Sequence, residues 1–235
     1  MTAARARRSA RRRAVLAAAV AAPAALAALP ALAAAAPTIA TSAICLRPSQ
    51  EPGGTQIAPR LDVTGSGFSP NSLIALTRGA QSITTYSDAA GNLAYSFSVF
   101  DLLSSRVPRA TPLDVLASDP ALGPSNALRV KAAPLSFSAT PKRTKPSRTV
   151  TFRFSGFTPD RPIYAHYRFG GHLRATVRMG LASKPCGLLS ARRDQIPVRD
   201  PQVGLWRVQF SQSRTFKAKS VPRIDATVNV FNTPR

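Results

Sequence analysis

The sequence predicts an all-β protein in which two tandem β-sandwich domains follow an N-terminal signal peptide. Three observations lead to this fold class. No segment after residue 36 keeps the apolar period of a helix over ten or more positions. Short runs that alternate apolar and polar residues recur instead, and Gly, Pro, Asn and Asp cluster between them. One such run, with the turn that follows it, occurs a second time about 89 residues later.

Residues 1–36 have the composition of a signal peptide. The first 13 residues carry six arginines and no acid, and residues 14–36 contain no charged side chain and end in small residues. Arg-Arg-Ala-Val-Leu at residues 12–16 has the form of a twin-arginine motif, so that export route is one option. An uncleaved membrane anchor is the alternative, but the stretch is mostly alanine and is interrupted by Pro23 and Pro30. We therefore expect an exported protein, cleaved near residues 33–35.

The first domain is predicted over residues 37–133. A strand at residues 82–85 leads into a turn at residues 88–92. After this turn, four apolar residues alternate with small or polar ones: Leu93, Tyr95, Phe97 and Val99. Two further short strands, at residues 113–117 and 127–130, are separated by Asp-Pro and Gly-Pro turns.

The strand–turn–strand segment at residues 63–76 returns in altered form at residues 152–165. Both copies contain Ser-Gly-Phe, then Ser or Thr, then Pro, then Asn or Asp. This pattern predicts a sharp corner between two strands, with a buried Phe at its centre. The repeat implies two related modules, each near the size of an immunoglobulin-like sandwich.

The first copy of the corner is similar to a known family. Val-Thr-Gly-Ser-Gly-Phe-Ser-Pro-Asn-Ser at residues 63–72, followed by Ser-Asp-Ala-Ala-Gly-Asn-Leu at residues 87–93, resembles the bacterial immunoglobulin-like modules of the IPT/TIG kind, which occur in exported surface proteins. The resemblance covers residues 60–131 and, in the second half, only the corner. It implies an adhesive, spacer or binding role and carries over no catalytic residue.

The second domain, residues 149–235, is predicted to follow a Pro- and Lys-rich linker at residues 134–148. Residues 134–235 hold 19 Lys and Arg against four acids, whereas residues 37–133 hold seven against six. The codon bias of a GC-rich genome would raise the arginine content of both halves alike. The asymmetry between the halves therefore indicates an anionic partner for the second domain. We expect an envelope polymer or a membrane surface. Nucleic acid is disfavoured, because no nucleic-acid motif is present and export leads out of the cytoplasm.

A β-hairpin with one cationic face is predicted within the second domain. Apolar residues alternate along residues 163–169 and again along residues 173–179. A two-residue loop at Gly170-Gly171 would set the two apolar faces on opposite sides, so a three-residue loop at residues 170–172 is expected.

The outer face of this hairpin is the candidate ligand-binding strip. Arginine forks suit phosphate and carboxylate oxygens, and an aromatic ring can stack on a sugar or base. The candidate residues are Tyr164, His166, Arg168, Arg174 and Arg178, with Arg192 and Arg193 as an extension. The alternative is a solvated sheet face without a ligand. Two further basic tracts, residues 142–148 and 214–219, are expected in loops, and Trp206, with Val208 and Phe210, is expected in the core.

Cys45 and Cys186, the two cysteines of the chain, are predicted to form a disulfide, with two free thiols as the alternative. A cysteine enzyme, with Cys186 as nucleophile and His166 or His172 as base, is a second alternative. We expect a protein that is not an enzyme, because no carboxylate pair for glycoside hydrolysis stands out and no phosphate-binding loop is present. No cofactor is predicted, and the His and Cys spacing fits no metal site.

Overall fold

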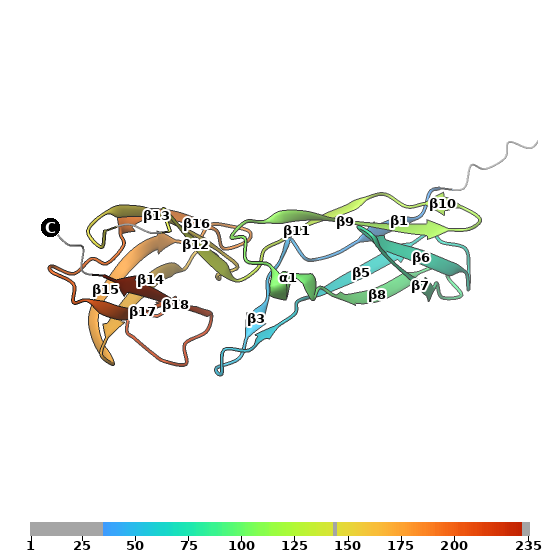
Figure 1. Cartoon of the computed structure of the whole chain (residues 1–235). Coiled ribbons are helices and arrows are strands. Elements are labelled where there is room, and N and C mark those ends of the chain that lie inside the picture. The colour runs from blue at the N-terminus through green and yellow to red at the C-terminus, as the bar shows by residue number, and fades with distance from the viewer. Residues whose placement is uncertain (1–34, 143–144, 232–235) are drawn as a thin grey trace, which may run out of the picture. The chain divides into compact units, whose positions relative to one another are not determined.

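The computed structural model describes residues 35–142 and 145–231, and the predicted leader therefore lies almost entirely outside the described residues. The described chain is built of strands with one short helix, α1 (Asp101–Ser104), as Figure 1 shows. The all-β prediction is confirmed. Within these residues no helix is long and apolar enough to cross a bilayer.

Two sheets form the first sandwich. One sheet has the order β1 (Thr38–Ala40), β5 (Arg60–Ser66), β8 (Leu93–Ser98). The other has the order β2 (Cys45–Leu46), β11 (Leu128–Ala132), β9 (Thr111–Asp119), β6 (Leu73–Arg78), β7 (Gln81–Tyr86), and the short β10 (Gly123–Pro124) pairs with β9. A small hairpin of β3 (Ser49–Gln50) and β4 (Gln56–Ile57) stands apart from both sheets. Side chains of both sheets, among them Leu61, Val63, Ile74 and Val115, share one buried core.

The second sandwich repeats this arrangement. Its smaller sheet has the order β12 (Ser136–Thr140), β13 (Thr149–Ser155), β16 (Leu189–Asp194). Its larger sheet has the order β15 (His172–Leu181), β14 (Pro162–Phe169), β17 (Gly204–Ser211), β18 (Arg223–Val230). The core between them contains Phe154, Phe157, Phe210 and Trp206, as predicted for the tryptophan.

Both sandwiches have immunoglobulin-like strand order. In chain order, the first, second and fifth main strands make one sheet, and the third, fourth, sixth and seventh make the other. In the first sandwich the short β2 also pairs in parallel with the last strand, β11. The sequence repeat therefore reflects two copies of one fold.

The predicted linker at residues 134–148 contains a strand, so the linker prediction is wrong for residues 136–140. These residues form β12, which pairs along its whole length with β13. The cause is visible in the sequence: Phe137 and Ala139 alternate with Ser and Thr, which is a strand pattern. The Pro and Lys residues that follow belong to the connection between β12 and β13 and obscured that pattern.

The repeated corner is held in the same way in both sandwiches. Its aromatic residue, Phe68 or Phe157, is buried. In the first sandwich the backbone N–H of Ser69 donates to Asp119 at the end of β9, over 2.7 Å. In the second, the N–H of Thr158 donates to Gln212 just after β17, over 3.2 Å. Each corner is therefore fixed to its core by a polar side chain from the sixth main strand or the residue that follows it.

The β14–β15 hairpin differs from its prediction. Phe169 pairs with His172, so the loop is the two-residue turn Gly170-Gly171, with both glycines at positive φ (56° and 84°). Tyr167 then pairs with Ala175 and Arg168 with Leu173, which leaves Arg174 unpaired in a β-bulge. The three-residue loop was wrong, because the bulge supplies the extra residue that returns the apolar positions of β15 to the core side.

Candidate functional site

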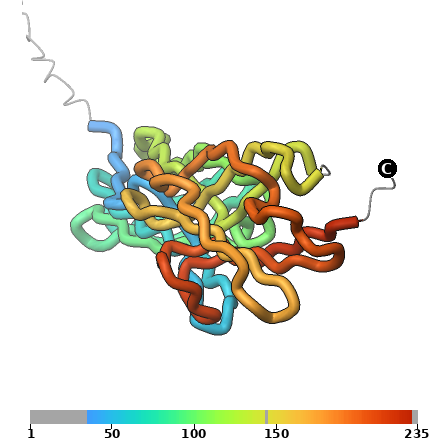
Figure 2. Tube along the Cα trace, turned by 90° about the vertical axis from the view of Figure 1, so that its left-hand side faces the viewer, coloured from blue at the N-terminus to red at the C-terminus, as the bar shows by residue number. Residues whose placement is uncertain are grey.

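The candidate site lies on the outer face of the β15-β14-β17-β18 sheet. The register places Tyr164 opposite Arg178 and His166 opposite Thr176, as expected for a shared face. Along the opposite edge of β14, where β17 pairs with it, Arg168 is the register partner of Arg207 on β17. The hairpin (orange) can be followed in Figure 2 beside the loop of residues 212–222 (red).

Arg168 and Arg207 form what we call the arginine pair. Like charges directly opposite each other on neighbouring strands destabilise a sheet, and a bound anion removes that cost. One hollow of about 310 Å³ is lined by both arginines together with Gly170, Gly171 and Leu205. A second, of about 570 Å³, is also lined by both arginines and includes Phe216. Both arginines therefore line both hollows on this surface.

Arg168 is held in place by two contacts. One of its guanidinium N–H groups donates to the carbonyl of Gly171 over 2.8 Å. Its Cζ lies 4.6 Å from the centre of the Phe216 ring, a cation–π contact. Arg168 is thus oriented before any ligand arrives, and its remaining N–H groups are left for an anion.

His166 is fully buried, so its predicted place on an exposed binding strip is wrong. The loop of residues 212–222 covers it: the carbonyl of Ser213 lies 3.1 Å from Nε2, and the Phe216 ring meets the imidazole edge-on at 5.9 Å between centroids. Nδ1 lies 3.0 Å from the hydroxyl of Thr176. Burial lowers the pKa of His166, although the hydrogen bond to Ser213 opposes the shift. Both ring nitrogens of His166 have hydrogen-bond partners, so the residue holds the loop against the sheet and is not free to bind a ligand.

The covering loop is itself cationic. Gln209 fixes it, because its side-chain amide donates to the carbonyl of Lys217 and to the hydroxyl of Ser220. Arg214, Lys217 and Lys219 are exposed on the loop. The other basic tract, which includes Lys142, lies in the connection between β12 and β13, at the opposite end of the sandwich.

The remaining strip residues are divided between the two sheets. Arg174 and Arg178 are exposed on β15, and Tyr164 is half-buried opposite Arg178. Arg192 and Arg193 are exposed on β16, in the other sheet, where they pair with Thr151 and Val150. They therefore do not extend the strip, because β16 belongs to the smaller sheet. The sequence pattern does not reveal this pairing.

Cys45 and Cys186 form the predicted disulfide, with their Cα atoms 5.5 Å apart. Both sulfurs are bonded, so Cys186 offers no thiolate for catalysis and the cysteine-enzyme alternative is overturned. Next to the bridge, Arg47 donates to the carbonyl of Phe157 over 2.8 Å, and burial lowers the pKa of this arginine. The disulfide joins β2 of the first sandwich to the turn before β16 of the second.

Sequence reasoning missed Arg207 and Phe216. A signal for Arg207 was present: if Trp206, Val208 and Phe210 face the core, Leu205, Arg207 and Gln209 face outward. Phe216 gave no such signal, because its contacts with Arg168 and His166 depend on the path of a loop. Within residues 35–142 and 145–231, no three His, Cys, Asp or Glu side chains gather as metal ligands would.

No family model and no curated protein matches the chain. Among solved structures, it is similar to the ligand-binding domain of human OSCAR (10% identity, 83% of this chain and 97% of that one, TM-score 0.30). It is also similar to the D00-D0 domain of intimin (12%, 83% and 100%, 0.37) and to a Ca²⁺-stabilised adhesin with which an Antarctic bacterium binds ice (15%, 83% and 48%, 0.27). At these TM-scores the likenesses carry no functional argument.

Proposed function

We propose that the protein is an exported, non-enzymatic component of the cell envelope whose second sandwich binds an anionic polymer or an anionic membrane surface. The binding surface consists of the arginine pair, the exposed arginines of β15 and the cationic loop of residues 212–222. We also propose that the chain is of the IPT/TIG kind, on the resemblance of its first corner.

The observation that carries this proposal is the juxtaposition of Arg168 and Arg207. Of the ion pairs among the described residues, none includes either side chain. Asp225 lines one of the hollows, but its carboxylate pairs with Arg223 at 3.1 Å. Two arginines that are register partners on neighbouring strands, neither with an ion-pair partner, favour phosphate or carboxylate oxygens, because a guanidinium group can bind such oxygens through two N–H groups.

The disulfide and the composition of the predicted leader support the proposed compartment. Disulfides persist in oxidising surroundings and are rare in the cytosol. The composition of residues 1–36 supports export to such surroundings. A wall polymer or anionic lipid headgroups would meet the protein there.

The test is binding to two anionic probes: polyphosphate, in place of a phosphate-bearing polymer, and vesicles that contain an anionic lipid. We expect the double variant R168A/R207A to weaken binding about tenfold or more at 50 mM salt, because two charge-assisted contacts are lost. Binding of the unaltered protein should fall steeply between 50 mM and 500 mM salt, since salt screens exposed charges.

R153A/R192A is the matched control. Both arginines are exposed on β13 and β16, so the control removes the same charge from the other sheet. It should change affinity about twofold at most, by lowering net charge. Equal losses in the two double variants would mean diffuse attraction without a site. No binding to either probe would favour the alternative of a ligand-free spacer.

A further inference from the structure

The two sandwiches differ at one edge. In the first, β2 lies beside the last strand, β11, and Leu46 of β2 is buried with Ala132 of β11. In the second, no described strand lies beyond the last strand, β18. Three of its four inward-facing side chains, Ile224, Ala226 and Val228, are only partly buried, and Val230 at the end of the strand is buried. The core of the second sandwich is therefore accessible between β12 and β18.

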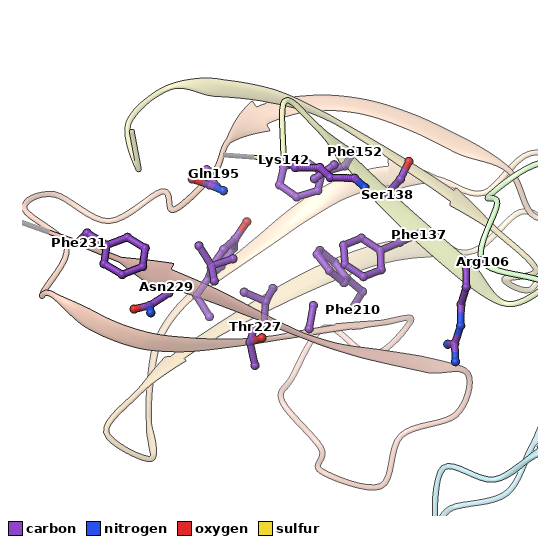
Figure 3. Close-up of a pocket in the computed structure, with 15 residues that line it drawn as sticks. Arg106, Phe137, Ser138, Lys142, Phe152, Gln195, Phe210, Thr227, Asn229 and Phe231 are labelled. Atoms are coloured by element: carbon purple, nitrogen blue, oxygen red, sulfur yellow. The ribbon is translucent and has the colours of Figure 1, made fainter. Parts of the chain in front are cut away.

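A cavity of about 900 Å³ occupies this opening (Figure 3). The size lies within the range of roughly 300–1,000 Å³ that is typical of small-molecule sites. Its apolar lining comes from both sheets: Phe137, Ala139, Phe152, Val208, Phe210, Ala226 and Val228. The rings of Phe137 and Phe210 lie 5.0 Å apart between centroids and form one wall. Such a lining fits an alkyl chain.

A small group of polar side chains also lines the cavity. The hydroxyl of Tyr167 is buried and has no hydrogen-bond partner among the described protein atoms. Burial raises the pKa of Tyr167, and the charge of Asp194 adds to the shift, so the hydroxyl keeps its proton and remains a donor. The side-chain amides of Gln195 and Asn229 lie toward one side of the cavity, and Phe137 and Phe210 toward the other (Figure 3).

The charged groups in the lining are cationic. Lys142, just after β12, and Arg106 are the charged residues among those that line the cavity; Asp194, whose charge acts on Tyr167, does not line it. The lining therefore favours a ligand with an apolar tail and a negatively charged oxygen group. A cationic amphiphile of equal length would meet two like charges.

We propose that this cavity binds a long-chain fatty carboxylate. The alkyl chain lies against Phe137 and Phe210, and the carboxylate accepts hydrogen bonds from Tyr167 and the neighbouring amides, with Lys142 supplying positive charge. The arginine pair lies on the outer face of the larger sheet, and neither arginine lines this cavity, although Val208, Ala226 and Thr227 line both the cavity and the hollow beside Phe216. The proposal does not depend on the proposed envelope function.

The first experiment is a displacement assay on the full mature chain. Parinarate, a fluorescent polyene fatty acid, serves as the probe, and palmitate and hexadecyltrimethylammonium serve as competitors. We expect saturable parinarate binding, displacement by palmitate at micromolar concentration, and at least tenfold weaker displacement by the cationic amphiphile. Absence of saturable binding, or equal displacement by both competitors, overturns the proposal.

Variants then locate the site. A139F and A226F each place a ring in the cavity and should lower palmitate affinity at least tenfold. A94F adds the same ring at an exposed position on β8 and should leave palmitate affinity unchanged. Y167F keeps the ring but removes the donor, and we expect about three- to tenfold weaker palmitate binding. Its melting temperature should be no lower than that of the unaltered protein, because the hydroxyl has no protein partner to lose.

Melting temperatures show whether A139F and A226F remain folded, and Y167F, which adds no volume, provides a test where they do not. The proposed site is overturned if palmitate affinity is unchanged in Y167F and in whichever of A139F and A226F remains folded. R168A/R207A should bind palmitate as the unaltered protein does, so failure of the anionic-surface proposal and failure of this one give different results.

Discussion

Arg168 on β14 and Arg207 on β17 are register partners on the outer face of the second sandwich, and both border the same two hollows. Arg168 is also fixed by Gly171 and by the Phe216 ring. A sheet that keeps two facing guanidinium groups loses some stability in the absence of an anion.

The arginine pair should therefore show opposite effects on stability and binding. R207T removes one of two like charges and places a residue with high strand propensity on β17. We expect the free energy of unfolding to rise by about 0.2–1 kcal/mol while affinity for polyphosphate falls. Urea unfolding and a binding titration measure both effects on one sample.

R153T is the control for that experiment. Arg153 is exposed on β13 opposite Ser190, so no like charge faces it there. Its replacement should leave affinity nearly unchanged. A loss of stability in R207T would indicate that Arg207 makes a stabilising contact of its own and that the two facing charges do not carry a net cost.

The buried His166 makes stability depend on pH in a defined direction. Its pKa is lower in the folded chain than the ordinary value near 6.5, so the unfolded chain binds the proton more readily. The free energy of unfolding should be constant above about pH 7.5, and fall as the pH drops through about 6.5 toward the folded-state pKa. Denaturant unfolding between pH 8 and pH 5 measures this slope.

H166Q isolates the contribution of that imidazole. The slope between pH 7 and pH 5.5 should become smaller in H166Q and should remain in H172Q, since His172 is exposed at the hairpin turn. If H172Q removed the slope instead, His166 would not be the group that titrates. An unchanged slope in both variants would assign the effect to carboxylates.

Gly187 supports the second corner by having no side chain. It has a φ of +66°, and a Cβ there would lie 1.7 Å from the carbonyl oxygen of Phe157. We expect G187A to lower the free energy of unfolding by about 3 kcal/mol or more, because both backbone strain and a steric clash result. Thermal and urea unfolding measure the loss.

G171A separates strain from clash. Gly171 also has positive φ, but a Cβ there would meet no atom within 4 Å. The expected cost is about 1–2 kcal/mol, from the left-handed backbone alone. Equal losses in G171A and G187A would show that the contact with Phe157 adds nothing.

The disulfide should contribute strongly to stability. Cys45 and Cys186 are 141 residues apart, and in the chain-entropy model a loop of this length gives about 5 kcal/mol. The double variant C45A/C186A should therefore melt at a clearly lower temperature than the oxidised protein. A reducing agent should lower the melting temperature of the unaltered protein and leave that of the double variant unchanged. A melting temperature equal to that of the oxidised protein would contradict this.

Local patterns in the sequence were enough for the fold class, the repeated corner, the buried Trp206 and the disulfide. Each of these rests on alternation, on turn residues or on the number of cysteines. The pairing of Arg168 with Arg207 joins strands 39 positions apart in the sequence, and local alternation does not specify which strands become neighbours.

The corrections have the same origin. His166 is outward by alternation, yet a loop more than 45 residues later in the chain covers it. The hairpin loop differs from its prediction because a bulge at Arg174 and a longer turn would each bring the apolar residues of β14 and β15 onto the same face of the sheet. Arg192 and Arg193 lie away from the strip because β16 pairs with β13 in the other sheet, and alternation along β16 does not specify that pairing.

Chemical-shift mapping with short-chain polyphosphate at low salt tests most directly whether the second sandwich binds anions through the arginine pair. We predict salt-reversible shifts of the backbone amides of Arg168, Arg207 and residues 212–222, with the amides of β13 and β16 unaffected. Shifts spread equally over both sheets, or confined to the sheet that carries Arg153 and Arg192, would contradict that binding mode.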